Sequence, residues 1–181
     1  MRTAGMAATA KHFPGHGAAV ADSHKAPPVD RRPLTELTDE LLPYRRMIAN
    51  GLTSVMVAHV LFPEVDAAPA GFSARWIQQE LRWGLGFTGA VFSDDLSMGG
   101  AAYAGTVPER ARRAIEAGCD LLPICNDRPA VLATLTELEG AADPLSQVRL
   151  VRLHGRPMPA REQLRRTAQW AECQRAIDHC R

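Results

Sequence analysis

The stretch Ala90-Val-Phe-Ser-Asp-Asp-Leu-Ser-Met98 runs from a short apolar segment directly into two carboxylates. Its first four residues predict a buried strand, and the two aspartates fall where that strand ends. Glycines follow Met98 and favour a loop. Carboxylates displayed on a loop at the end of a buried strand are typical of functional sites. The sequence therefore predicts a site at one edge of a sheet.

A second polar cluster lies near the start of the chain, in Lys11-His-Phe-Pro-Gly-His-Gly17 and Asp22-Ser-His24. A loop this dense in lysine, histidine and carboxylate is hard to explain by packing. Asp22 and His24 are two residues apart, so the carboxylate can accept from one ring nitrogen and leave the other free for proton transfer. The alternative is a turn in which Asp22 caps local amides and the histidines are solvated.

The chain alternates predicted strands and helices. We expect strands at Met6–His12, Thr53–Ala58, Ala90–Ser93 and Asp120–Ile124. We expect helices at Thr38–Ala49, from an N-cap at Ser73 to about Trp83, from a capping box at Thr106 and Glu109 to Ala117, and at Arg128–Glu139. This order predicts a parallel α/β sheet with right-handed crossovers. The polar clusters all follow strand ends, where (β/α)₈ barrels place their active sites.

The two polar clusters together resemble the bacterial β-N-acetylglucosaminidases (β-hexosaminidases) of glycoside hydrolase family 3. Further similar blocks are Val55-Met-Val-Ala-His-Val60, Gly71-Phe-Ser-Ala-Arg-Trp76 and Ala117-Gly-Cys-Asp-Leu-Leu122. The similarity runs from about Gly5 to Asn126, with the blocks in the family's order. The family's Gln-Glu-Gly-Gly-Arg substrate-binding block has no counterpart in this sequence.

The resemblance implies a (β/α)₈ TIM-type barrel, of which residues 1–141 would be the second half, units five to eight. A full barrel takes about 250 residues, so a chain of 181 residues is expected to be a fragment or a truncated reading frame. Residues 142–181 would form a C-terminal appendage with one long helix from about Pro159.

The resemblance also implies a retaining glycosidase that removes terminal N-acetylglucosamine through a covalent glycosyl-enzyme. Asp94 would be the nucleophile, and strand alternation would turn Asp95 away from it, as a cap or ion-pair partner. His24 would be the general acid/base, because an imidazole with a reference pKa of about 6.5 can both donate and accept a proton near neutral pH. Asp22 would orient the ring of His24.

Three further residues would bind the sugar. Lys11 and His12 match the family's sugar-binding pair, since an ammonium and an imidazole can donate to ring hydroxyls. His59 is expected to line the pocket, and His16 to serve loop structure.

The resemblance implies a cytoplasmic enzyme of cell-wall recycling that acts on small carbohydrates or muropeptides without a cofactor or metal. No apolar run approaches the roughly 20 residues that span a bilayer. The four cysteines lack C-x-x-C spacing and are expected to be reduced thiols. Unpaired edges of a half barrel would expose apolar surface, so self-association is expected.

Charge is unevenly distributed along the chain. Residues 1–143 carry a net charge of −4 and residues 144–181 a net charge of +5. A basic tail can indicate nucleic-acid binding. Here the arginines are interleaved with apolar residues at helical spacing, which favours a helix docked on the acidic remainder.

Two alternatives to an active glycosidase remain. One is an inactive remnant that lacks half of the barrel. The other is a metal-dependent barrel hydrolase with His12, His16, His24 and Asp94 as ligands, since imidazole and carboxylate bind zinc. Against the second, the residues between His12 and His16 are Phe-Pro-Gly, so the two histidines cannot share one helical face as they do in metalloproteases.

Overall fold

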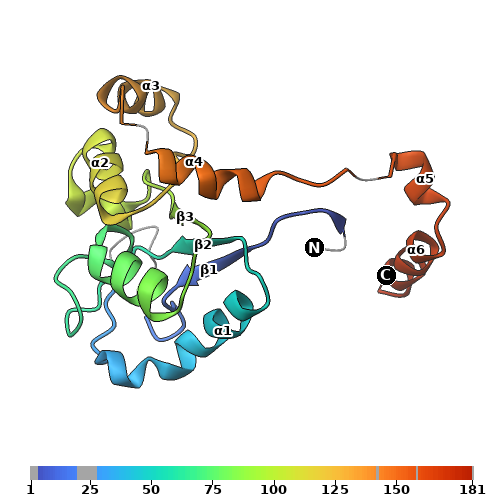
Figure 1. Cartoon of the computed structure of the whole chain (residues 1–181), viewed down its shortest axis with the longest axis horizontal. Coiled ribbons are helices and arrows are strands. Elements are labelled where there is room, and N and C mark those ends of the chain that lie inside the picture. Colours follow the sequence, from blue (N-terminus) through green and yellow to red (C-terminus); the bar gives the residue numbers. More distant parts are fainter. Residues whose placement is uncertain (1–3, 20–27, 142, 158, 181) are drawn as a thin grey trace. The chain divides into compact units, whose positions relative to one another are not determined.

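A computed structural model describes residues 4–19, 28–141, 143–157 and 159–180 (Figure 1). The chain divides into two compact units, and each is described by itself. The larger unit is Ala7–His154, and the smaller combines Met1–Met6 with Gly155–Arg181. Among the described residues, no helix is both long and apolar enough to cross a membrane.

The larger unit contains a parallel sheet of three strands, which lie side by side in Figure 1. They are β1 (Thr9–Phe13), β2 (Ser54–Val57) and β3 (Ala90–Ser93), in the order β1-β2-β3. The predicted parallel sheet is confirmed. β1 begins later than expected, because the backbone N–H and carbonyl of Ala8 bond to the hydroxyl of Thr53 instead of a strand backbone, at 3.1 and 2.9 Å.

The fourth predicted strand, Asp120–Ile124, is reduced to one parallel bridge between Phe92 and Leu121. The Ser93 N–H donates to the Leu121 carbonyl at 2.9 Å, and the Leu96 N–H donates to the Pro123 carbonyl at 2.9 Å. Pro123 has no N–H to return, so the ladder cannot continue in both directions. The segment still runs beside β3 and carries its end close to Asp94 and Asp95.

The helices of the larger unit follow the predicted order. Their observed bounds are α1 (Thr38–Ala49), the π-helix η4 (Arg75–Gly84), α2 (Val107–Ala117), α3 (Arg128–Glu137) and α4 (Pro144–Leu150). Short 3₁₀ turns are η2 (Leu34–Glu36), η3 (Ala70–Phe72), η5 (Gly99–Ala104) and η6 (Val151–Leu153). The capping box of α2 is confirmed, with Glu109 accepting from the Thr106 N–H at 2.7 Å. The expected α-helix from Ser73 is instead a π-helix over most of its length.

Aromatic rings from three elements pack against one another in the core. Phe13 of β1 lies edge-on to Tyr44 of α1, with ring centroids 5.1 Å apart. Trp76 of η4 is fully buried and meets both Phe13 and Phe62, at 6.0 and 5.0 Å. Burying such large side chains is the main stabilising contribution that holds α1 and η4 against the sheet.

The smaller unit contains α5 (Arg161–Arg165) and α6 (Ala168–His179). The single long helix expected from Pro159 is therefore wrong. Thr167 separates the two helices, because its hydroxyl accepts from the Trp170 N–H at 3.1 Å and so caps the start of α6. The larger unit ends at His154 and therefore includes α4.

Candidate active site

Polar side chains from separate strands meet at the carboxyl ends of the sheet. His12 lies on β1, His59 follows β2, and Asp94 and Asp95 follow β3. The His12 Nε2 atom is 3.7 Å from Asp94 Oδ2. Parallel strands end at the same edge, so residues far apart in the chain are brought into one site.

Asp94 is held in one orientation by its own neighbour. The Asp95 N–H donates to Asp94 Oδ1 at 2.9 Å, which leaves Oδ2 on the side of His12. The Asp94 side chain is 13% exposed, so its carboxylate is mostly shielded but still reaches solvent. An anionic oxygen that is fixed and partly desolvated is suited to attack or to stabilise a positive centre.

His12 is half-buried next to three groups that affect its charge. Burial lowers its pKa from the usual value for histidine, Lys11 and His16 lower it further, and the Asp94 carboxylate opposes them. The His16 ring lies edge-on to the His12 ring, with centroids 6.2 Å apart. Lys11 is exposed. His12 is therefore neutral at neutral pH and offers one N–H donor beside Asp94.

Asp95 caps the turn that follows β3. Its Oδ1 atom accepts from the Ser97 N–H at 2.9 Å, the Ser97 hydroxyl at 2.7 Å and the Cys125 N–H at 3.1 Å. Burial alone would raise the pKa of Asp95, but the hydrogen bonds from Ser97 and Cys125 outweigh it and lower the pKa. Sequence analysis missed Ser97, although a serine two residues after an aspartate is a common turn signal.

His59 is fully buried directly behind the Asp94–Asp95 turn. Its Nε2 atom is 3.2 Å from the Asp95 carbonyl, and its ring stacks on Phe72 with centroids 5.1 Å apart and planes 7° apart. Burial lowers the pKa of His59, against the opposing effect of Asp94. The ring does not reach solvent, whereas the sequence led us to expect it in the lining of the pocket.

Asp22 and His24 lie outside the described residues, so their expected pairing has no structural description. Within the part of the chain that the structure describes, no group of three or more histidine, cysteine, aspartate or glutamate side chains could hold a metal ion. Of the four ligands in the metal-dependent alternative, His12 and Asp94 approach one another.

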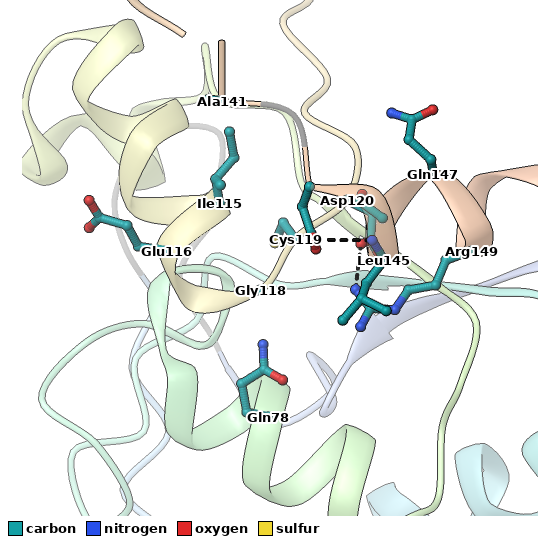
Figure 2. Close-up of a pocket in the computed structure, with 12 residues that line it drawn as sticks. Gln78, Ile115, Glu116, Gly118, Cys119, Asp120, Ala141, Leu145, Gln147 and Arg149 are labelled. Carbon is teal, nitrogen blue, oxygen red and sulfur yellow. Dashed lines mark hydrogen bonds and ion pairs between the residues drawn. The ribbon is translucent and has the colours of Figure 1, made fainter.

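A pocket of about 380 Å³ lies elsewhere in the larger unit (Figure 2). Cys119, Asp120 and Arg149 are among its lining residues, and none of the predicted site residues lines it. Asp120 bonds to the Val91 N–H near the start of β3, whereas Asp94 follows its end. Residues at the amino ends of barrel strands serve stability rather than chemistry.

Fully buried His59 and half-buried His12 predict a pH-dependent stability. Because burial lowers the pKa of His12 and His59, the unfolded chain binds more protons than the folded chain below the reference pKa of about 6.5. The histidines' contribution to the free energy of unfolding is therefore expected to be fully present above about pH 6.5 and to decrease as the pH drops below it. Urea unfolding at about pH 7.5 and about pH 5.5 measures this, above the range in which most carboxyl groups titrate.

His59→Phe supplies the comparison, since phenylalanine keeps a ring against Phe72 and removes the titrating group. The variant should lose less stability than the unaltered chain between the two pH values. An identical loss in both proteins would show that His59 does not contribute.

Comparisons with known proteins agree on one family. Residues 1–151 match the model described as the glycosyl hydrolase family 3 N terminal domain. A beta-hexosaminidase of Nitrosospira multiformis is 51% identical over 160 residues, which cover 88% of this chain and 46% of that protein. A beta-hexosaminidase of Thiobacillus denitrificans is 50% identical over 175 residues, which cover 95% of this chain and 49% of that protein.

A solved structure gives the same result. NagZ from Neisseria gonorrhoeae, in complex with N-trifluoroacetyl-D-glucosamine, is 40% identical and superposes with a TM-score of 0.80. The match covers 96% of this chain and 51% of that one, so this chain spans about half the length of the relatives it matches. The chain belongs to glycosyl hydrolase family 3 and has that family's TIM-barrel-like α/β fold with a parallel sheet.

Proposed function

We propose that this chain supplies the catalytic half of a retaining exo-β-N-acetylglucosaminidase. The observation that carries the proposal is the Asp94 carboxylate at the end of β3, with Oδ1 held by the Asp95 N–H and Oδ2 facing His12. Two relatives with about 50% sequence identity to this chain are beta-hexosaminidases, and the NagZ relative was solved with an N-acylated glucosamine. Residues 1–141 would form units five to eight of a (β/α)₈ barrel, and residues 142–181 an appendage.

In this mechanism Asp94 Oδ2 attacks the anomeric carbon and forms a glycosyl-enzyme. His24, oriented by Asp22, protonates the leaving oxygen and then deprotonates the water that releases the sugar. Lys11 and the neutral His12 donate to sugar hydroxyls beside Asp94. The residues require no cofactor for these steps.

The proposed substrate is terminal β-linked N-acetylglucosamine on cell-wall muropeptides, and the proposed setting is peptidoglycan recycling in the cytoplasm. Support for this finer assignment comes from the family resemblance of the Lys11–Gly17 and Ala90–Met98 blocks. Nucleic acid and membrane are not proposed partners.

The decisive experiment supplies the half of the protein that the match leaves out. A chimera would join this chain to the part of the Thiobacillus denitrificans beta-hexosaminidase that it does not match. The chimera is expected to hydrolyse a chromogenic N-acetylglucosaminide, because both halves of the sugar-binding shell are then present. A folded, monomeric chimera without turnover would instead favour an inactive remnant.

Residues 1–181 alone are expected to self-associate and to be inactive. α3 exposes Leu132 and Leu135, and α4 exposes Leu145 and Val148. Loss of a bound, oriented sugar removes an effect that can reach about 7–11 kcal/mol of the barrier. Light scattering and the same chromogenic assay measure both outcomes. A soluble monomer with appreciable turnover would contradict this prediction.

A further inference from the structure

We propose that His59 is a positioning residue for Asp94, which fixes the backbone of the nucleophile's turn rather than binding sugar. This inference rests on the proposed role of Asp94. It differs from the expected role of His59 as a pocket-lining sugar ligand, and it assigns a task to a buried polar ring that the proposed mechanism does not use.

The main chain of Asp95 connects the two side chains. Its N–H donates to Asp94 Oδ1 at 2.9 Å, and its carbonyl accepts from His59 Nε2 at 3.2 Å. Both polar groups of this one residue are thus engaged, the first by the nucleophile and the second by His59. A shift of the Asp95 backbone would move the donor that sets the direction of the Asp94 carboxylate.

The same turn is anchored on two other sides. The Asp95 side chain accepts from the Cys125 N–H, which belongs to the segment beside β3, and from Ser97 within the turn. The Met98 N–H also donates to the Asp95 carbonyl, at 3.2 Å. His59 supplies the contact from the β2 side. Its loss would leave the turn held only by Cys125 and by the bonds from Ser97 and Met98, among the described residues.

The surroundings of His59 fix both the position of its ring and its tautomer. The ring is fully buried and stacked on Phe72, and a Cβ at Gly71 would lie 3.0 Å from Nδ1. Among the described residues, Nδ1 has no hydrogen-bond partner, whereas Nε2 faces a carbonyl, which can only accept. The neutral Nε2–H tautomer satisfies this arrangement, and burial lowers the pKa of His59 in the same sense.

A fully buried ring cannot contact a sugar without opening the core, but it can hold the backbone that carries the nucleophile. Displacement of a reacting group by about 1 Å can lower turnover about 10²-fold. Loss of His59 is therefore expected to lower kcat at a nearly constant KM. If His59 instead bound the sugar equally well in the ground state and the transition state, its loss would raise KM and leave kcat unchanged.

The test uses the chimera with three variants at or beside His59. His59→Phe keeps the stacked ring and removes the donor, and should lower kcat about 10²-fold with KM within about twofold. His59→Gln places an amide N–H at a similar reach and should recover part of kcat. Gly71→Ala adds a methyl against Nδ1 and should lower kcat by displacing the ring.

The control is Gly155→Ala, whose new methyl would lie 3.6 Å from the Gly5 carbonyl, an ordinary contact. It should leave kcat and KM unchanged. A raised KM with unchanged kcat in His59→Phe would overturn the inference and return His59 to sugar binding, while the proposed function would stand. Unchanged kcat and KM would overturn it as well. Full activity in Asp94→Ala would instead overturn the proposed function.

A spectroscopic measurement decides the case if the unaltered chimera has no turnover. Nitrogen NMR of the histidine rings should show His59 neutral and protonated at Nε2. Carboxyl carbon NMR should show that the Asp94 signal moves in His59→Phe. A doubly protonated or Nδ1-protonated ring, or an Asp94 signal that does not move, would overturn the inference.

Discussion

Asp94→Ala is expected to lower kcat of the chimera by at least about 10⁴-fold, the scale on which removal of a nucleophile acts. Without the carboxylate no glycosyl-enzyme can form, and water would have to attack an unassisted sugar. The chromogenic assay measures the loss, with circular dichroism to confirm that the variant folds. A small anion such as azide should recover part of the turnover in the vacated space and yield a product of the opposite anomeric configuration.

Asp95→Ala is the matched control, because it removes the adjacent carboxylate and leaves the backbone N–H that holds Asp94. Loss of its three bonds to Ser97 and Cys125 loosens the turn. The Asp95 N–H that holds Asp94 and the carbonyl that His59 contacts both remain, so kcat should fall by about tenfold or less. Equal losses in two folded variants would contradict the assignment of Asp94. Turnover that a chelator removes and zinc restores would favour the metal-dependent alternative.

Local signals predicted several elements of the fold correctly. α1 has the expected bounds, and the capping box of α2 forms as expected, because both depend on residues within one or two helical turns. The reduction of the fourth predicted strand to one bridge was not predictable in this way. Its pairing is limited by Pro123 and by the Asp120 side chain, which takes the Val91 N–H in place of a backbone carbonyl.

Some features of the candidate site were likewise predictable from local sequence, and others depend on residues far apart in the chain. The sequence predicted that the polar clusters follow strand ends, and the topology of a parallel sheet brings those ends together. His12 and Asp94 lie 3.7 Å apart at this edge. The burial of His59 depends on Phe72 and Gly71, which belong to a later turn. The contact between Asp95 and Cys125 joins residues thirty positions apart, so no local pattern signals it.

Asp120→Ala is expected to lower the free energy of unfolding by about 3–5 kcal/mol, the usual effect of removing one partner of a buried ion pair. The Asp120 side chain is 2% exposed and binds Arg82 and Arg149, each at 2.9 Å. Its Oδ2 atom also accepts from the Val91 N–H at 2.8 Å. One carboxylate thus joins η4, β3 and α4, and Figure 2 shows Asp120 with Arg149 on the pocket wall.

Asp120→Ala is expected to lower the stability this much because it leaves the buried Arg82 cation without its carboxylate partner. The Arg82 side chain is 11% exposed and, among the described residues, would keep its charge with only the Gly89 and Gly118 carbonyls as acceptors. Burial already lowers the pKa of Arg82, so the cation is poorly solvated even in the intact protein. Thermal unfolding of the chimera, which is about twice as long as this chain, should show a Tm lower by about 4–7 °C.

Arg152→Ala is the control for this substitution, because Arg152 is exposed and bonds only to Thr88 among the described residues. Its effect should stay within about 0.5 kcal/mol, as for most surface changes. Arg149→Ala should lie between the two, since Asp120 would keep Arg82 and the Val91 N–H. If Asp120→Ala and Arg152→Ala lower Tm equally, the buried pair does not stabilise the sheet. If only Asp120→Ala lowers it while kcat of the remaining folded protein is unchanged, the amino ends of the strands support the fold and the carboxyl ends perform the chemistry.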